Sequence, residues 1–385
     1  MRAFIDNMDV GTHQSLQTRK IIQFLLREKG KTMPEIREFS GLSLPTTIKF
    51  INDLLDRNIL IESGKKESSG GRRPTVYRLN PEQGYIVGVE LLLKSFRMSI
   101  INLNHEVIYD YETDNFDISK REDAFDFLVR TVPALINSKG IADEKILGVG
   151  IGITGRVNRD RGISYSFLNF DQPLTKLLEA QWNYPVFIDN DTHFMTLGEQ
   201  TFGLARGKQD VVYVNLSRGL AVGLISNGQI HNGHSGFAGE FGHISFFDND
   251  KLCICGKKGC LSTVVSGASV EEAYQEKTGK ALSYRELMVL SKQGDRLVNE
   301  LLSEVGEQLG KALSLLIQVL NPELLILGGR FSEVGEYLKY PIIRGMSLHS
   351  LPQLMADCDV QVSPLGEKAE MLGAYALVME KVFEP

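Results

Sequence analysis

The sequence lacks any uninterrupted apolar segment whose length approaches the roughly 18 residues that a membrane-spanning helix requires. Its opening, MRAFIDNMDVGTHQSLQTRK, also lacks the continuous apolar stretch of a secretion signal. We therefore expect no membrane partner and a cytoplasmic location. Cysteine is scarce as well: the 385 residues include four, three of them between residues 253 and 260. Without a secretion signal, such crowding favours a metal site over disulfide bonds.

An overall excess of positive charge is also absent, because the formal net charge is -6. Residues 1–80, however, hold 14 Lys and Arg against 9 Asp and Glu, and the remaining residues hold 28 against 39. A basic head on an acidic body predicts that only the head contacts a polyanion such as DNA, although a chance asymmetry would give the same numbers. A chain of this length should form two or three packed units.

The head contains three segments with helical patterns. Residues 15–29 place apolar side chains at helical spacing, and residues 31–60 predict two short helices separated at Ser40-Gly41. Thr32 and Ser43 are suitable N-cap residues for these two helices. Two short helices of this length, separated by a Ser-Gly turn, are typical of a helix-turn-helix.

The second of the two short helices would enter the major groove of DNA, and Thr46 and Lys49 near its start are our candidates for base contacts. Thr47 and Ile48 fit either the core or the DNA face. The side chains expected in the core are Phe50, Ile51, Leu54 and Leu55. A plain helical bundle would show the same pattern, so the assignment depends on the segment that comes after this helix.

Residues 59–80 contain two alternating segments around a Gly/Ser loop that carries Arg72 and Arg73. They predict a β-hairpin wing with a cationic tip. Arginines beside glycines can follow a phosphate backbone or enter a narrow minor groove. A solvated basic loop is the alternative, but the preceding helix-turn-helix favours the wing.

The body predicts an α/β fold. Three strand-length segments precede a helix over residues 120–138, and two more buried strands lead into a helix over residues 192–203. A second strand, glycine turn and strand begin at residue 210. The duplication predicts two lobes with a cleft between them, and small ligands favour such clefts.

One cluster has metal-ligand spacing, and its members are His243, Cys253, Cys255 and Cys260. Three thiolates and an imidazole favour Zn²⁺ in a closed tetrahedron, which leaves no position for a catalytic water and predicts a structural role. Gly256 and Gly259 allow the chain to fold sharply around an ion. Free cysteines are also common buried hydrophobes, but this spacing favours zinc.

Residues 237–260, FAGEFGHISFFDNDKLCICGKKGC, resemble the signature of the ROK family of repressors and sugar kinases. The segments ITGRVN, FIDNDTHFMTLGE, LNPELLILGGRFSE and SGGRRP are also similar to the family's motifs. The resemblance implies a winged helix-turn-helix followed by a two-lobed, actin-like and ribonuclease-H-like sugar-kinase fold. The implied domains are a DNA-binding domain at 1–80, a first lobe at 81–195 joined by a C-terminal helix at 368–385, and a second lobe at 196–367.

The resemblance also implies a sugar site whose residues are Asn169, Asn190, Asp191, Glu240 and His243. Since His243 would face both the sugar and the zinc, the metal would hold one wall of the site. Asp191 stands where the kinases of the family place their catalytic base. It is also positioned, like Thr192, to cap the following helix.

The sequence departs from the kinases of the family on the phosphate side. Residues 90–94 read Glu-Leu-Leu-Leu-Lys where the kinases have Asp-Gly-Gly-Thr, whose glycines let backbone amides approach phosphate. We expect the three leucine side chains to occupy the space of the phosphates. Residues 217–219 read Ser-Arg-Gly in place of Gly-Thr-Gly, and Ser262 replaces a sugar-binding Glu. These differences predict that the kinase activity is lost and that Asp191 is a vestigial base.

The expected function is therefore a transcriptional regulator of carbohydrate metabolism, most simply a repressor, whose binding to an operator depends on a sugar or sugar derivative. Helix-turn-helix heads on a near-palindromic operator predict a homodimer or homotetramer. One alternative is an active sugar kinase that uses ATP and Asp191 as base. Another is a repressor controlled by a protein partner.

Overall fold

The structure, a computed structural model, describes residues 13–28, 30–66 and 73–383. Its contacts divide the chain into two compact units. The first comprises Met1–Asp191 and Met371–Pro385, and the second comprises Thr192–Glu370. The first unit therefore includes both the N-terminal head and the first lobe.

Three helices open the described chain: α2 (His13–Arg27), α3 (Met33–Ser40) and α4 (Leu44–Asp56). Gly41 ends α3 in the left-handed conformation, with φ of 66°, and Ser43 caps α4 by accepting a hydrogen bond from the Thr46 amide. The helices share a core of buried side chains, namely Ile21, Ile22, Leu25, Leu26, Ile36, Ile51 and Leu54. The two short helices and the Ser40-Gly41 turn between them lie where the sequence predicted them.

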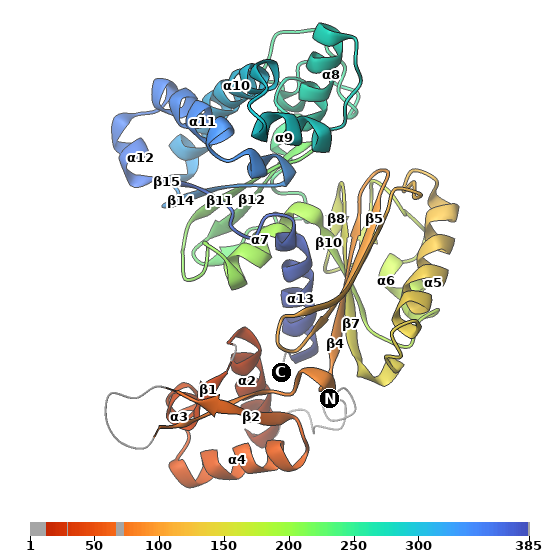
Figure 1. The fold of residues 1–385 in the computed structure, drawn as a ribbon, viewed down its shortest axis with the longest axis vertical. Helices are drawn as coiled ribbons and strands as arrows, with labels where there is room; N and C mark the ends of the chain where they lie inside the picture. The colour runs from red at the N-terminus through yellow and green to blue at the C-terminus, as the bar shows by residue number, and fades with distance from the viewer. Residues whose placement is uncertain (1–12, 29, 67–72, 384–385) are drawn as a thin grey trace. The chain divides into compact units, whose positions relative to one another are not determined.

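A three-stranded sheet completes the head in the order β1-β3-β2. Strands β2 (Leu60–Lys65) and β3 (Thr75–Leu79) form the predicted antiparallel hairpin, in which Leu60 pairs with Leu79. Strand β1 (Lys31–Thr32) pairs with the other edge of β3 and was not predicted, since two residues give no periodic signal. The head is a winged helix-turn-helix (Figure 1).

The body contains two five-stranded sheets, ordered β10-β7-β4-β5-β6 and β13-β12-β11-β14-β15. In both sheets the first strand along the chain is central. The next two strands extend antiparallel on one side, and the last two run parallel to it on the other. The predicted duplication is thus a repeated sheet topology, which confirms the α/β class.

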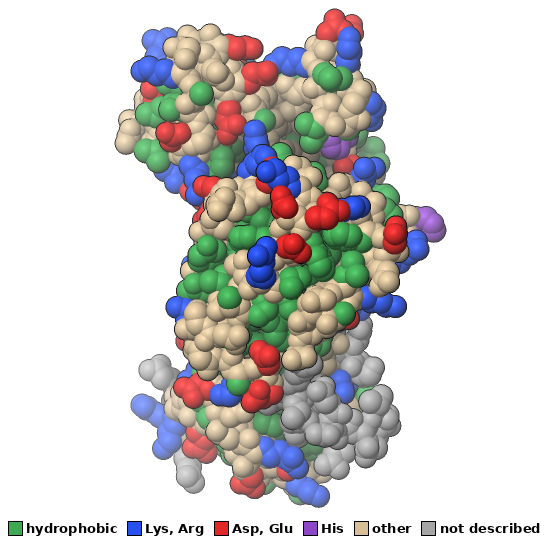
Figure 2. Space-filling model, turned by 90° about the vertical axis from the view of Figure 1, so that its right-hand side faces the viewer, with side chains coloured by type: hydrophobic (Ala, Val, Ile, Leu, Met, Phe, Trp, Pro, Cys, Tyr) green, Lys and Arg blue, Asp and Glu red, His purple; other side chains and the backbone are tan. Residues whose placement is uncertain are grey.

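The strands of the first sheet are β4 (Tyr85–Leu91), β5 (Phe96–Asn102), β6 (Val107–Thr113), β7 (Ile146–Ile153) and β10 (Val186–Asn190). Helices α5 (Arg121–Asn137) and α6 (Leu174–Glu179) cover one face, and α13 (Lys368–Phe383) covers the other (Figure 1). Apolar side chains of α5 are buried against the sheet, and others remain partly exposed on the outer surface that Figure 2 shows. A short hairpin of β8 (Val157–Asn158) and β9 (Ile163–Ser164) follows β7.

Glycines let α13 approach the first sheet closely. A Cβ added to Gly88 would lie 2.8 Å from the sulfur of Met371, and one added to Gly150 would lie 3.0 Å from the Cβ of Ala374. The first distance is shorter than real Cβ contacts and the second is tighter than most of them, so the helix rests almost directly on the backbone of β4 and β7.

The strands of the second sheet are β11 (Val211–Leu216), β12 (Leu220–Ser226), β13 (Gln229–Ile230), β14 (Leu324–Gly328) and β15 (Asp359–Val362). The helices of this unit are α7 (Asp191–Phe202), α8 (Gly267–Thr278), α9 (Tyr284–Lys292), α10 (Arg296–Leu320), α11 (Glu336–His349) and α12 (Pro352–Asp357). Val212 and Val214 enter the core with α10 and α11, whereas Val211 and Tyr213 enter a second core with Met195 of α7. This alternation gives the sheet two buried faces.

Short 3-10 turns connect the longer elements. They are η1 (Pro81–Gln83), η2 (Asp143–Lys145), η3 (Phe241–His243), η4 (Leu261–Thr263) and η5 (Arg330–Val334). Within the described residues, no helix combines the length and apolar character needed to cross a membrane.

Candidate functional site

The cysteine loop, residues 244–260, connects η3 to η4 in the second unit. Isolated β-bridges join Ser245 to Cys260 and Leu252 to Lys258, so the loop folds back on itself. Gly259 has φ of 71°, and a Cβ there would lie 2.2 Å from the Phe247 carbonyl oxygen. Only glycine fits this position.

The loop brings together the four predicted metal ligands, His243, Cys253, Cys255 and Cys260, whose ligand atoms all lie within 4.8 Å of one another. The Cys253 sulfur is 3.4 Å from His243 Nδ1, and the Cys255 and Cys260 sulfurs are 3.6 Å apart. Zn–S bonds of about 2.3 Å and Zn–N bonds of about 2.0 Å place tetrahedral ligands roughly 3.5–3.8 Å apart. The donor set and its spacing therefore fit a zinc ion.

The thiols of the cluster differ in acidity. Burial by itself raises the pKa of each, but hydrogen bonds to the sulfurs of Cys253 and Cys255 outweigh it and lower their pKa values. Burial and then the neighbouring thiols raise the pKa of Cys260 to about 12. The third thiolate therefore needs a nearby positive charge, which a divalent cation would supply.

The opposite side of the His243 ring faces Glu240, whose Oε2 lies 3.7 Å from His243 Nε2. The structure thus places two predicted sugar-binding residues side by side, and one of them also belongs to the metal cluster. Ser262 lies behind the cluster, where its hydroxyl is 3.7 Å from the Cys253 sulfur.

A tight turn positions Glu240. Gly239 has φ of 94°, and a Cβ there would lie 1.8 Å from the Val222 carbonyl oxygen. Val222 donates its amide to the Gly239 carbonyl at 3.0 Å, which holds the turn against β12. His193 of α7, which sequence reasoning did not single out, lies with its Nε2 3.3 Å from the Ala238 carbonyl. Non-local packing therefore sets the place of Glu240.

The first unit contains the other predicted ligand-binding residues. Asn190 ends β10 and donates its side-chain amide to the Gly155 carbonyl at 2.8 Å, and Asp191 begins α7. A carboxylate in a first helical turn is favoured by the helix dipole. The N-cap position before α7 belongs to Asn190, so the expectation that Asp191 or Thr192 caps this helix is wrong. Asn169 lies in an exposed loop, where its carbonyl accepts a hydrogen bond from Arg121 at 2.9 Å.

Sequence reasoning missed Arg159. Its guanidinium lies 3.6 Å from the buried carboxylate of Asp189. This carboxylate in turn accepts a hydrogen bond from the backbone amide of Asn190 at 2.7 Å. Arg159 therefore helps to hold the end of β10. An arginine in a loop, with Arg156 and Arg161 close to it in the sequence, gives no signal for such a contact.

The first turn of each lobe contains the residues that the resemblance aligns with the phosphate-binding turns of the family's kinases. In the first lobe, Leu91 belongs to β4 and is fully buried in the core, so the expectation that all three leucine side chains occupy the phosphate space is wrong for this residue. Leu92 donates its amide to the Ser95 carbonyl at 3.0 Å, which closes a tight hairpin. In the second lobe, the Ser217 and Arg218 carbonyls accept the first amides of α8, from Gly267 and Ala268.

The recognition helix α4 presents one exposed side. Lys49 is exposed, whereas Thr46 is half-buried and its hydroxyl lies 2.8 Å from that of Ser43. Thr47 is buried and Ile48 is exposed, which decides the two positions that the pattern left open. Ile51 and Leu54 lie in the core as expected, but Phe50 and Leu55 are only partly buried.

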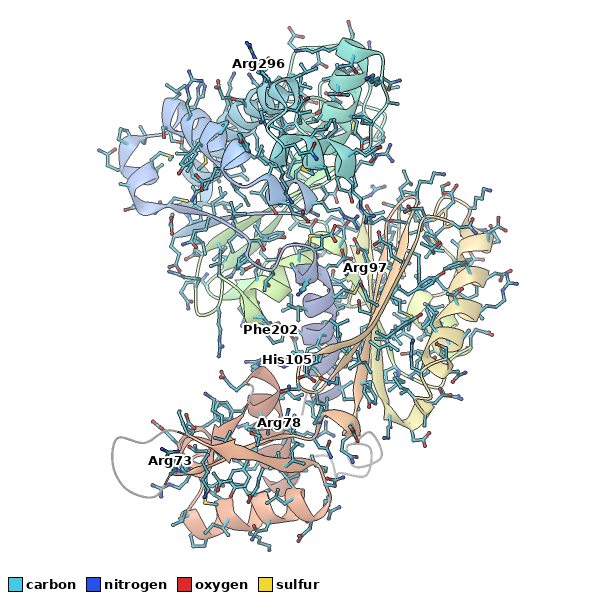
Figure 3. The ribbon with its side chains drawn as sticks, in the orientation of Figure 1. Arg73, Arg78, Arg97, His105, Phe202 and Arg296 are labelled. Atoms are coloured by element: carbon cyan, nitrogen blue, oxygen red, sulfur yellow. The ribbon has the colours of Figure 1, made fainter. Side chains whose placement is uncertain are left out.

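At the wing, Arg73 is exposed close to the start of β3 (Figure 3). Arg72 lies outside the described residues. Lys66, which follows β2 at the same end of the hairpin and donates its backbone amide to the Pro74 carbonyl at 3.0 Å, forms an ion pair of 2.8 Å with Glu35 of α3. The Lys66 hydrogen bond, with those from Thr32, lowers the pKa of Glu35 to about 2. This pair ties the wing to the helix-turn-helix.

A winged head, two lobes of equal topology and a His-Cys cluster define the class of the protein: a helix-turn-helix joined to a sugar-kinase-like body. A profile of the ROK family matches residues 86–381, and the chain belongs to this family.

The relatives include both repressors and kinases. The chain is 28% identical over 364 residues to a xylose repressor of Bacillus spizizenii, with 93% of this chain and 94% of that protein covered. It is 29% identical over 315 residues to a glucokinase of Thermotoga maritima, with 77% and 98% covered. A crystal structure of a ROK family transcriptional regulator, a homolog of the Escherichia coli MLC protein, matches with a TM-score of 0.78 at 24% identity and covers 97% of both chains.

Proposed function

We propose that the protein is a sequence-specific transcriptional repressor of carbohydrate metabolism, and that a sugar or sugar derivative changes its affinity for operator DNA. The observation that carries the proposal is the extent of the similarity. The xylose repressor matches 93% of the chain, whereas the glucokinase matches 77%. A winged helix-turn-helix is the part that a kinase does not need and a repressor does.

In this proposal, α4 lies in the major groove with Lys49 and Thr46 near the bases, while Arg72 and Arg73 of the wing contact phosphates or the minor groove. The protein binds its operator as a homodimer or homotetramer, and acts in the cytoplasm because its target is DNA. Residues 1–80 form the DNA-binding domain, 81–195 with 368–385 the first lobe, and 196–367 the second.

The sugar would contact Asn169, Asn190 and Asp191 of the first unit and Glu240 and His243 of the second. Zn²⁺ held by His243 and the three cysteines would supply a structural cross-link. It would fix the His243 ring, whose Nε2 then remains directed toward Glu240 and the sugar. Metal content and sugar affinity would therefore change together.

We further propose that the chain does not transfer phosphate. The hairpin amide of Leu92 and the first amides of α8 already donate to protein carbonyls, so they are not available to a phosphate in this conformation. A kinase remains the second candidate, because Asp191 keeps the place of the base and a glucokinase matches the body. Sugar-dependent ADP release from Mg-ATP, assayed with D-xylose, D-glucose and N-acetylglucosamine, would establish the kinase and refute this part of the proposal.

The test of the repressor function starts with operator fragments selected from genomic DNA by the purified protein. Lys49→Ala and Arg73→Ala should each weaken binding about three- to tenfold and reduce the salt dependence by about one counterion. Lys280→Ala, which removes an exposed cation of the second unit, is the matched control and should bind normally. One of the three sugars should change operator affinity about tenfold or more. Selection of no fragment, or unchanged binding by both head variants, would contradict the proposal.

A further inference from the structure

The head contacts the first lobe at a group of residues that no function described above uses. We call this group the head junction: Arg19, Gln23 and Leu26 of α2, His105 of the β5–β6 turn, and Tyr375, Val382 and Phe383 of α13. These residues belong to the same compact unit. We propose that the head junction fixes the head to the first lobe as one rigid body, so that movement of the lobe on sugar binding displaces the DNA-binding surface; this rests on the proposed function.

The last turn of α13 provides two of the contacts. Arg19 donates to the Val382 carbonyl at 3.4 Å, and Gln23 donates its side-chain amide to the Phe383 carbonyl at 3.1 Å. Carbonyls in the last turn of a helix have no partner within the helix, and the negative end of the helix dipole favours a cation. These two side chains of α2 therefore provide partners for two of the carbonyls at the end of α13.

His105 provides the third contact and touches both helices. Its Nε2 donates to the Leu26 carbonyl in the last turn of α2, and its ring meets that of Tyr375 in α13 edge to face, with centroids 5.0 Å apart. Figure 3 shows His105 at the tip of the β5–β6 turn, beside the head. The residue has φ of 59°, in the left-handed region that histidine, like asparagine, adopts more readily than most residues other than glycine.

The chain between head and lobe is also held at both ends. Asn80 donates its amide to the Ile59 carbonyl of the head at 2.8 Å. At the other end, a Cβ on Gly84 would lie 2.9 Å from Leu147 of β7, so the linker packs closely on the lobe. Only η1 lies between these two positions. A linker this short and this well anchored does not isolate the head from the lobe.

Helix α13 begins at the point in the sequence where the chain returns from the second unit to the first, and it ends at the head junction. The chain passes between the units at Asp191/Thr192 and at Glu370/Met371, and the second crossing lies in the first turn of α13. From Met371 onward the helix rests on Gly88 and Gly150 of the first sheet. Because of this close packing, α13 and the sheet move together, and the head bound to its far end must follow.

The test compares the full-length wild type with a junction variant that combines Arg19→Ala, Gln23→Ala and His105→Asn. Asparagine tolerates the positive φ at position 105, which protects the turn. Lys20→Ala is the matched control, because Lys20 is an exposed cation of α2 outside the junction. Hydrogen exchange followed by mass spectrometry should be faster in the variant at the last turns of α2 and α13, and unchanged in the control. Equal exchange in wild type and variant would overturn the proposal.

A second measurement tests the coupling. The ratio of operator Kd with and without sugar, using whichever of D-xylose, D-glucose and N-acetylglucosamine acts on the wild type, should fall from about tenfold or more to within about twofold of unity. Sugar affinity measured by calorimetry should stay within about threefold of wild type, since no junction residue lies at the sugar site. A ratio equal to that of the wild type would overturn the proposal. If no sugar affects the wild type, the proposed function fails, and hydrogen exchange still decides whether the junction exists.

Discussion

The two lobes have the same sheet topology but differ at their first turns and in what is added to them. The first lobe closes its turn with Leu92 and Leu93, whereas the second keeps Gly219 in its turn and adds the cysteine loop. Equal topology shows that the sheet order does not determine the chemistry of a lobe. Turn residues and inserted loops determine it, because they decide which amides, carboxylates and imidazoles face a ligand.

The largest effect is expected from removing a metal ligand of the cysteine loop, which the second lobe has and the first lobe lacks. Cys255→Ser removes one thiolate of the cluster and should reduce zinc content from about one ion per chain to near zero. Since His243 would lose its fixed orientation, sugar affinity should fall about 10- to 100-fold. Metal analysis and calorimetry on the same samples measure both effects. Cys358→Ala, which changes a cysteine outside the cluster, is the control and should keep its zinc. Full zinc content in Cys255→Ser would show that the cluster is not the metal site.

A glycine of each lobe offers the second comparison. Gly239→Ala in the second lobe would force a Cβ to within 1.8 Å of the Val222 carbonyl at φ of 94° and should lower the free energy of unfolding by about 2–3 kcal/mol. Gly140→Ala in the first lobe also has positive φ but open space around it, so it should cost about 1 kcal/mol. Urea unfolding of the two variants gives the difference. Equal losses would mean that the turn before Glu240 relaxes without strain.

The third prediction concerns the leucine turn of the first lobe. Replacing both Leu92 and Leu93 by Gly should create no sugar-dependent ADP release, because the first amides of α8 in the second lobe still donate to Ser217 and Arg218. Leu93 is exposed and Leu92 half-buried, so the stability loss should stay below about 2 kcal/mol. A coupled ADP assay and thermal unfolding measure these outcomes. Appearance of kinase activity would show that the leucines alone block phosphate transfer.

The smallest effect is expected at the ion pair beside that turn. The Lys94 ammonium hydrogen-bonds to Asp117 and, with Ser119, lowers the pKa of that carboxyl from 3.8 to about 2. A lowered folded-state pKa stabilises the protein above pH about 3.8, and this contribution disappears as the pH falls toward 2. Lys94→Ala should therefore raise the Asp117 pKa toward its ordinary value while hardly changing stability, since exposed pairs contribute little. Titration of the Asp117 carboxyl by NMR measures the shift, and an unchanged pKa would exclude Lys94 as its cause.

Much of the fold followed from the pattern of apolar residues. The helix-turn-helix, the wing and both sets of strands lie where periodicity and turn residues predicted them, because these signals depend on neighbours a few residues apart. The metal cluster was predicted from the identity and spacing of four side chains, and the structure places their ligand atoms together. The sequence left open whether Thr47 and Ile48 of α4 are buried or exposed, because both residues lie at the edge of the apolar stripe of this helix.

The sequence by itself determined the α/β class, the winged head and the donor set of the cysteine loop. Only the tertiary structure decided that Leu91 belongs to the core, that Arg159 holds the end of β10, and that His105 joins α2 to α13. The physical reason is distance along the chain. Helix caps, strand alternation and a short metal-binding loop are local, whereas these contacts join residues tens of positions apart, and their geometry exists only after the sheets and helices have packed.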